Sequence, residues 1–518
     1  MVGAEGLSLG TLTFESPAEP PGLDATRRSP DKIGIRRRLG GPVALLQHLI
    51  VVVPGIGGSV LAEPDGSSAW DLKSADVGRT FIGPDRLNSG RELTPVRLVD
   101  DLAVLRPWLV VSGYGRLTQM LRRQFGAGLR VADYRAAEAV PADLDVLRVP
   151  YDFRRSVAGS AELLGRAVTA AVGDSGRRVV VVGHSLGGLV SRYWLGPGGG
   201  WRHCRALITL GTPHRGAPRA LDWLVNGAGV GSARIGSVSR VLRGWPSMYE
   251  LLPQYPAVLG ADGVPVEVAA LPPEAVREFG SGPAGADLLR RADDAARVHR
   301  DIAAGWAAIA ESERPALLPY FGRGHATLDR AVLRGGRLLV EKKAAQWRGN
   351  VGWLGDGTVP AISAIPTELS ERHEQAQAVP DKHGPMGVTS AVIEKLVTLQ
   401  GDDLPIRGTD RPPAPWVGWD LDDAVPAGQE TAVAAMVHHG AAGPDEVTGT
   451  GATLALSGGS QRVSLPMTRT EDGWRATLPP LPEGTYEVAI EVKDAWYGTS
   501  LYASIPLAAV TPEVELSS

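Results

Sequence analysis

The sequence predicts an α/β fold with a mostly parallel sheet, followed by a small all-β domain. Strand-like apolar runs alternate with helical patterns over residues 46–405, which is typical of parallel sheets with helices on both faces. A run of valines leads through a short turn into a helical pattern at residues 179–195. Over residues 429–518 the runs are short and alternate at about ten-residue spacing, which predicts an immunoglobulin-like β-sandwich.

The first domain is expected to contain its strands and helices in regular alternation. Apolar runs bounded by turn residues predict strands, and apolar residues at helical spacing predict helices. Strands are expected within residues 48–55, 143–154, 179–182, 204–218, 316–324 and 331–343, and helices within 114–126, 160–172, 186–195 and 386–399.

Three further segments lack this alternation. Residues 1–45 are rich in Gly, Pro, Ser and charge, and they predict a flexible N-terminal extension. Between about 219 and 315 the strand pattern fades, which favours a lid inserted over the site, with peripheral decoration as the alternative. Residues 406–428 are rich in proline and predict a linker.

Composition restricts the classes of function. The net charge is −4 with no basic stripe, so binding to nucleic acid is not expected. No uninterrupted apolar run reaches the roughly 18 residues of a spanning helix, and a cytoplasmic location is the default expectation. The single cysteine, Cys204, excludes a disulfide within the chain and is interpreted as a buried apolar residue. The sequence predicts no cofactor and no metal site.

The pattern G-x-S-x-G occurs twice, around Ser8 and around Ser185. Ser185 follows the strand-like run VVVV and precedes a helical pattern, which is the context of a nucleophile elbow. Gly183 and Gly187 are needed there because side chains would collide across the turn. Ser8 has no strand before it, and Pro, Glu and Ser follow it. Ser185 is therefore the predicted nucleophile.

A serine hydroxyl needs a base, which is usually a histidine oriented by a carboxylate. In α/β-hydrolases the chain order is Ser, acid, His. Asp356 lies between two glycines in a predicted turn, with a structural Asx turn as the alternative. His383 lies in a Pro/Gly loop before the last helix, whereas His325 precedes the acid and His373 lies in a charged, solvated stretch. Asp356 and His383 are therefore the predicted partners of Ser185.

The reaction also needs two donors for the developing oxyanion. One is the backbone N–H after the nucleophile, which belongs to Leu186. The second is expected from the glycine-rich loop after the first strand, where Ile56 would supply the N–H. The alternatives for this loop are an ordinary turn or a phosphate cradle, and the motif of a nucleotide-binding loop does not continue here.

Seven motifs in chain order resemble the lecithin:cholesterol acyltransferase-like family of α/β-hydrolases, which includes lysosomal phospholipase and phospholipid:diacylglycerol acyltransferases. They lie between about residues 48 and 400 and are VVVPGIGGSVL (51–61), AWD (69–71), VPYDFR (149–154), GHSLGG (183–188), LGTPHRGAP (210–218), PSMYELLPQYP (246–256) and GDGTVP (355–360).

The resemblance implies an α/β-hydrolase fold with a triad of Ser185, His383 and Asp356. It implies acyl transfer from a lipid ester through an acyl-serine, and contact of Trp70 with the acyl chain. The chain departs from the eukaryotic members of the family, whose disulfides around the lid are excluded here by the single cysteine. The C-terminal sandwich is not part of the family core, and a binding partner for it is unknown.

Three functions are consistent with these residues. The favoured one is a serine acyltransferase or lipase that acts on lipid esters, with peripheral contact to a lipid surface. The alternative is a carboxylesterase on soluble esters, because the predicted lid mixes apolar and charged stretches. The third is an inactive hydrolase scaffold that carries a binding sandwich, and the presence of all three triad residues argues against it.

Overall fold

The computed structural model describes residues 46–71, 84–100, 103–105, 109–111, 113–230, 233–234, 236–271, 285–334, 337–343, 354–370, 376–384, 386, 390–400, 415–438, 449–459, 461–496 and 499–511. These residues all belong to one compact unit, residues 44–518. The predicted extension 1–45, with Ser8, and the alternative base His373 lie outside the described residues.

Within the described residues the central sheet has seven strands, all parallel. They are β1 (Leu49–Val53), β7 (Val131–Asp133), β8 (Val146–Arg148), β9 (Val179–His184), β10 (Cys204–Leu210), β15 (Ala316–Gly322) and β18 (Gln377–Val379). Their order is β18–β15–β10–β9–β1–β8–β7. Cys204, at the start of β10, is fully buried, as predicted.

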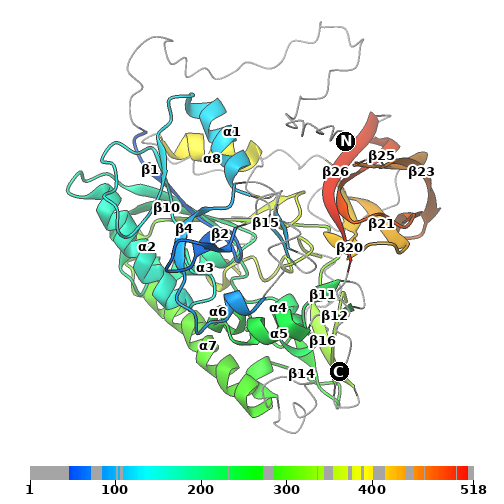
Figure 1. Ribbon diagram of the computed structural model, residues 1–518, viewed down its shortest axis with the longest axis horizontal. Coiled ribbons are helices and arrows are strands. Elements are labelled where there is room, and N and C mark those ends of the chain that lie inside the picture. Colours follow the sequence, from blue (N-terminus) through cyan, green and yellow to red (C-terminus); the bar gives the residue numbers. More distant parts are fainter. Residues whose placement is uncertain are drawn as a thin grey trace, which may run out of the picture. The chain divides into compact units, whose positions relative to one another are not determined.

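Helices cover both faces of this sheet. Figure 1 shows α1 (Gly115–Phe125) and α8 (Ser390–Leu399) on one face, and α2 (Val157–Val172) and α3 (Leu186–Leu195) on the other. Alternate residues of each strand join opposite clusters, so that Ile50 packs with α1 and α8 while its neighbour Val51 packs with α2 and α3. Burial on both faces explains the uninterrupted valine runs. The arrangement is that of an α/β-hydrolase, as the sequence predicted.

The predicted lid region is mostly helical. It contains α4 (Pro218–Val225), α5 (Gly236–Arg243), α6 (Pro246–Glu250) and α7 (Gly285–Ala307), with two short strand pairs, β11 (Gly229–Val230) with β12 (Ala233–Arg234) and β13 (Val258–Leu259) with β14 (Pro265–Val266). None of the described helices combines the length and the apolar composition needed to cross a bilayer.

The run 331–343 does not extend the central sheet. It forms the hairpin β16 (Arg330–Arg334) and β17 (Arg337–Glu341), which joins β13 and β14 in a separate sheet. Local alternation predicts a strand but not the sheet to which it belongs. Smaller sheets outside the core are formed by β2 (Ser59–Ala62), β3 (Ser68–Trp70) and β4 (Thr94–Leu98), and by β5 (Ala103–Leu105) and β6 (Leu109–Val111).

The C-terminal part is a curled mixed sheet and not the predicted immunoglobulin-like sandwich. Among the described residues it has the strand order β19–β21–β24–β23–β22–β25–β26–β20. The strands are β19 (Trp416–Asp420), β20 (Ala424–Pro426), β21 (Thr431–His438), β22 (Gly451–Gly458), β23 (Gln461–Thr470), β24 (Gly473–Leu478), β25 (Gly484–Trp496) and β26 (Thr499–Val510).

The order of these strands requires the sheet to curl. β19 and β20 lie at opposite edges but are separated by only residues 421–423. Four chain steps reach at most about 14 Å, whereas the edges of a flat eight-stranded sheet would lie about 33 Å apart. The edges therefore meet at residues 421–423. Both strands fall within the predicted linker 406–428. The prolines of this segment are typical of a linker, so the sequence did not predict strands there.

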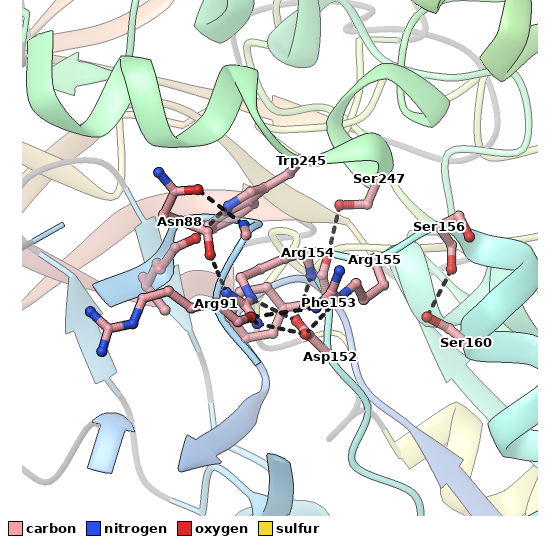
Figure 2. A network of polar contacts seen from close by, with 12 residues as sticks. Asn88, Arg91, Asp152, Phe153, Arg154, Arg155, Ser156, Ser160, Trp245 and Ser247 are labelled. Atoms are coloured by element: carbon pink, nitrogen blue, oxygen red, sulfur yellow. Dashed lines mark hydrogen bonds and ion pairs between the residues drawn. The ribbon is translucent and has the colours of Figure 1, made fainter. Parts of the chain in front are cut away.

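A buried arginine ties the segment before β4 to the loop after β8 (Figure 2). Arg154 is fully buried and donates two hydrogen bonds to the Asp152 carboxylate, at 2.8 and 2.7 Å. Its other donors reach the backbone carbonyls of Asn88 (2.6 Å) and Arg91 (3.0 Å). The family motif VPYDFR therefore has a structural role in this chain.

Replacing Arg154 with Ala is expected to destabilise the protein by about 3 kcal/mol. The change leaves the largely buried Asp152 charge and two carbonyls without their main donor. Breaking a buried ion pair from one side costs about 3–5 kcal/mol. Urea unfolding followed by tryptophan fluorescence measures the effect. Arg155→Ala is the matched control, because Arg155 is about half exposed and its ion pair with Asp152 is longer, at 3.3 Å. Equal midpoints for the two variants would contradict the prediction.

Candidate active site

Ser185 lies in the sharp turn between β9 and α3. Its backbone has φ 52° and ψ −124°, a conformation that is strained for a non-glycine residue. The turn is possible because the neighbouring glycines approach other parts of the chain closely. A Cβ on Gly187 would lie 2.3 Å from Pro54 O, and one on Gly188 would lie 1.8 Å from Thr212 Oγ1. The elbow therefore presents the Ser185 hydroxyl at the carboxyl end of the sheet.

Ser185, His383 and Asp356 form one continuous hydrogen-bonded chain. Ser185 Oγ lies 2.9 Å from His383 Nε2, and His383 Nδ1 lies 2.7 Å from Asp356 Oδ2. A carboxylate accepts only, so His383 Nδ1–H donates to Asp356 and Nε2 accepts the Ser185 proton. The structure brings together the three residues that the sequence predicted, although Ser185 and His383 are 198 positions apart in the chain.

The carboxylate of Asp356 is fixed in a tight turn and is only 1% exposed. Its second oxygen, Oδ1, accepts backbone N–H groups from Thr358 (2.9 Å) and Val359 (2.7 Å). The backbone carbonyl of Asp356 accepts the N–H of His383 at 2.9 Å. Gly211 leaves the space for the pair, because a Cβ there would lie 2.9 Å from both Asp356 Oδ2 and His383 Nδ1.

The surroundings of His383 favour its protonated form. Burial lowers the pKa of His383, but the charge of Asp356 and its hydrogen bond outweigh burial and leave the pKa above its ordinary value. A base with this pKa accepts the serine proton and keeps the resulting imidazolium stable beside the carboxylate.

Two backbone N–H groups lie beside the nucleophile. Ile56 borders the cavity that contains Ser185, and Leu186 is the first residue of α3. Among the described residues, no acceptor takes up either N–H group. The loop approaches closely enough that a Cβ on Gly55 would lie 2.9 Å from Ser185 Cβ. Both groups are therefore free to bind a developing oxyanion.

Three aromatic side chains hold the loop that carries Ile56. Tyr151 donates its hydroxyl to Pro54 O (2.9 Å), and the Tyr114 hydroxyl accepts the Gly55 N–H (2.8 Å). Trp70 donates its indole N–H to the carbonyl of the fourth loop residue, Gly57, at 2.9 Å.

The position of Trp70 differs from the predicted substrate contact. Its side chain is 1% exposed, packs against Phe153 and does not line the cavity of Ser185. The buried indole therefore supports the loop of Ile56 through its hydrogen bond to Gly57.

Part of the chain matches a known protein family. Residues 136–272 match the family model described as lecithin:cholesterol acyltransferase. Over this range the chain is similar to the lecithin:cholesterol acyltransferase family. The matched range contains Ser185 and the VPYDFR motif and ends before Asp356 and His383. No curated protein matches the sequence.

Solved structures with detectable similarity are distant. A chain of the Tle4–Tli4 complex is 14% identical, with 69% of this chain and 99% of that chain covered and a TM-score of 0.49. The lipase BlEst2 of Bacillus licheniformis in its propeptide form is 11% identical, with 89% and 93% covered and a TM-score of 0.32.

The site contains a second hydrogen-bonded chain that the sequence did not reveal. His184 Nε2 donates to His383 O at 3.0 Å, so its Nδ1 accepts from the Tyr114 hydroxyl at 2.9 Å, and Tyr114 accepts from Gly55. Burial lowers the pKa of His184 to about 4, so this ring stays neutral and keeps that tautomer. The loop of Ile56 and the loop of His383 are therefore connected. His184 lies inside the serine motif, which is the signal that could have identified it.

His325, which the sequence placed in the wrong order for a base, has a structural role. Its backbone pairs with Gly355, next to the acid, and its Nε2 donates to Pro380 O at 2.9 Å. Burial lowers the pKa of His325 to about 4, so it is neutral and its Nδ1 accepts the Trp419 N–H at 3.2 Å.

A cavity of about 290 Å³ opens on Ser185 and His383. Its apolar walls come from several elements and include Ile56, Trp223, Met248, Leu328, Val340 and Val359. Charged side chains also line it, namely Arg219, Asp222, Lys342, Lys382, Asp422 and Asp423. Residues of the predicted lid region and of the C-terminal sheet therefore border the same cavity.

Proposed function

We propose that this protein is a serine acyl-transfer enzyme that acts on lipid ester bonds through an acyl-serine intermediate. The observation that carries the proposal is the unbroken chain of hydrogen bonds from Ser185 through His383 to Asp356. A histidine that accepts from a serine hydroxyl and donates to a buried carboxylate has the geometry and tautomer of a serine hydrolase base.

In this mechanism Ser185 Oγ attacks the ester carbonyl while His383 Nε2 takes its proton. The N–H groups of Ile56 and Leu186 bind the oxyanion of the tetrahedral intermediate, each contributing about 3 kcal/mol. His383 then returns the proton to the leaving alcohol, and the acyl group stays on Ser185. Water or a second alcohol, deprotonated by His383, releases it as an acid or a new ester. Asp356 stabilises the imidazolium at both stages.

Lipid esters are the favoured substrates for two reasons. The sequence matches the lecithin:cholesterol acyltransferase family, and much of the cavity wall is apolar. The segment 219–251 borders the cavity and would act as a lid by excluding water, which favours transfer to an alcohol over hydrolysis. We infer that the enzyme meets its substrate at a lipid surface.

One observation favours a second candidate, a carboxylesterase on soluble esters. Six charged side chains line the cavity, and such a wall suits a polar ester better than two long acyl chains. Both candidates use the same triad. An inactive scaffold is disfavoured, because hydrogen bonds at 2.9 and 2.7 Å already connect the three residues.

Product analysis by mass spectrometry tests the proposal. Wild-type protein and Ser185→Ala are incubated with phosphatidylcholine vesicles that contain a long-chain alcohol, and in parallel with p-nitrophenyl butyrate. We expect fatty acid or new ester from the vesicles with wild type and none with the variant. The acid-to-ester ratio distinguishes hydrolysis from transfer. Turnover of the soluble ester alone would favour the carboxylesterase, and no Ser185-dependent product from either substrate would refute the proposal.

A further inference from the structure

The junction between the two edges of the C-terminal sheet lies at the cavity of Ser185. Leu421–Asp423 join β19 to β20, and Ala424 is the first residue of β20. All four residues line the same cavity as Ser185 and His383. The C-terminal sheet therefore contributes the wall where its curled edges meet.

Strand β19 is attached to the segment that follows β15. Ala326 N–H donates to Trp419 O at 3.0 Å, and Trp416 Nε1 donates to Arg323 O at 2.9 Å. A Cβ on Gly418 would lie 2.0 Å from Gly324 O, so the two backbones are in direct contact. Hydrogen bonds between backbone groups fix the position of β19 more closely than side-chain packing would.

His325 extends this attachment toward both predicted partners of Ser185. His325 accepts from the backbone of Trp419 on one side and donates to Pro380, three residues before His383, on the other. The backbone of His325 also pairs with Gly355, the residue before Asp356. The position of β19 is thus linked to both the acid turn and the loop of the base.

Lys382, which directly precedes His383, is bound by the C-terminal sheet. Its side chain is 4% exposed, and its ammonium group donates to Leu421 O at 2.7 Å and forms an ion pair with Asp423. Burying an ammonium group is costly unless it is paired. Because both partners belong to residues 421–423, the loop of His383 is held from the C-terminal sheet.

We propose, resting on the function proposed above, that residues Leu421–Ala424 of the C-terminal sheet complete the active site. Leu421 and Ala424 form an apolar wall against the hydrocarbon part of the ester, and Asp423 is a positioning residue that holds His383 through Lys382. The C-terminal sheet is then a determinant of substrate length as well as a support for the base.

Filling the wall tests the first part of this inference. Ala424→Phe narrows the cavity, and Ala432→Phe is the control, because Ala432 is exposed on β21 of the same sheet and does not line the cavity. With p-nitrophenyl acetate and octanoate, we expect Ala424→Phe to lower the octanoate-to-acetate ratio of kcat/KM by about tenfold, and the control to leave it unchanged. Ala424→Leu is a smaller change, expected in the same direction, should the phenylalanine variant not fold.

Removing the charge of Asp423 tests the second part. Asp423→Asn is expected to lower kcat for acetate about tenfold with little change in KM, and Asp423→Glu to restore most of it. The acid limb of the pH profile of kcat/KM should also move to lower pH. In this variant His383 keeps the Asp356 carboxylate but loses the nearby charge of Asp423. The charge of Lys382, no longer paired with Asp423, then disfavours protonation of His383. His184 stays neutral and adds no charge.

The outcomes separate this inference from the proposed function. Suppose that turnover depends on Ser185 but the octanoate-to-acetate ratio of kcat/KM is unchanged in both Ala424 variants. This result would refute the proposal that Leu421 and Ala424 contact the hydrocarbon part of the ester. An unchanged kcat and pH profile in Asp423→Asn would overturn the positioning role. Both results leave the acyl-transfer proposal intact, whereas a wild-type protein without Ser185-dependent turnover would refute the proposed function and this inference together.

Discussion

Replacing Asp356 with Asn is expected to lower kcat/KM for an ester substrate by about 10⁴-fold while the protein stays folded. The carboxylate accepts from His383 Nδ1 at 2.7 Å and so keeps Nε2 free to accept the Ser185 proton. An amide at this position offers an N–H₂ group that favours the opposite tautomer, in which Nε2 carries a proton and is no base. The measurement is the initial rate of p-nitrophenyl butyrate hydrolysis against pH.

The pH profile of the residual activity gives a second readout. In wild type, kcat/KM should rise with pH as His383 loses its proton, with a midpoint above the ordinary histidine pKa because of Asp356. In Asp356→Asn, burial acts without that opposing charge, so the pKa of His383 falls and the acid limb should move to lower pH. A limb that stays in place would mean that a group other than His383 controls the rate.

Asp145→Asn is the matched control for this variant. Asp145 is also 1% exposed, and its carboxylate also accepts two backbone N–H groups, from Leu46 at 2.8 Å and Arg130 at 3.1 Å. It lies just before β8, away from the cavity. Its replacement is expected to reduce stability and to leave kcat/KM within about threefold of wild type. A comparable loss of activity in both variants would show that Asp356 acts only through folding.

The elements that the sequence predicted well are those determined by local pattern. The valine run before Ser185 is buried on both faces and therefore forms a central strand, and the glycines after it permit the strained turn. The order Ser, acid, His reflects the order of parallel strands, whose carboxyl ends lie at one edge of the sheet. Chain order and loop context pointed to Asp356 and His383, and the structure brings both residues into one hydrogen-bonded chain with Ser185.

Features that depend on pairing between distant segments were missed. Trp416 pairs with His438 and Ala424 pairs with Ala508, so the two strands in the proline-rich segment are recognisable only through partners far along the chain. Local alternation predicted short antiparallel strands but not their closure into one curled sheet. The sequence placed Trp70 against the substrate, whereas its side chain is buried away from the cavity. A short motif does not show whether an aromatic side chain is exposed or buried.

Replacing Tyr114 with Phe is expected to lower kcat about 100-fold, the effect of weakening one oxyanion donor. The hydroxyl accepts the Gly55 N–H at 2.8 Å and donates to His184 Nδ1. Phenylalanine lacks this hydroxyl and therefore makes neither hydrogen bond. Its loss leaves two buried polar groups without a partner at a cost of about 1–3 kcal/mol each. Rotation of the loop backbone would satisfy the Gly55 N–H and turn the N–H of Ile56 away from the oxyanion.

Transition-state binding separates this effect from general destabilisation. A phosphonate or boronate that forms a tetrahedral adduct with Ser185 should bind Tyr114→Phe more weakly by the same factor as kcat falls, with KM little changed, because the loop contacts the oxyanion and not the ground-state ester. Tyr320→Phe is the control. Tyr320 is also buried, but its hydroxyl donates a long hydrogen bond, 3.5 Å, to Ala391 O on α8. If both variants lose stability and only Tyr114→Phe loses affinity for the adduct, the Tyr114 hydroxyl keeps the loop of Ile56 in position for the oxyanion.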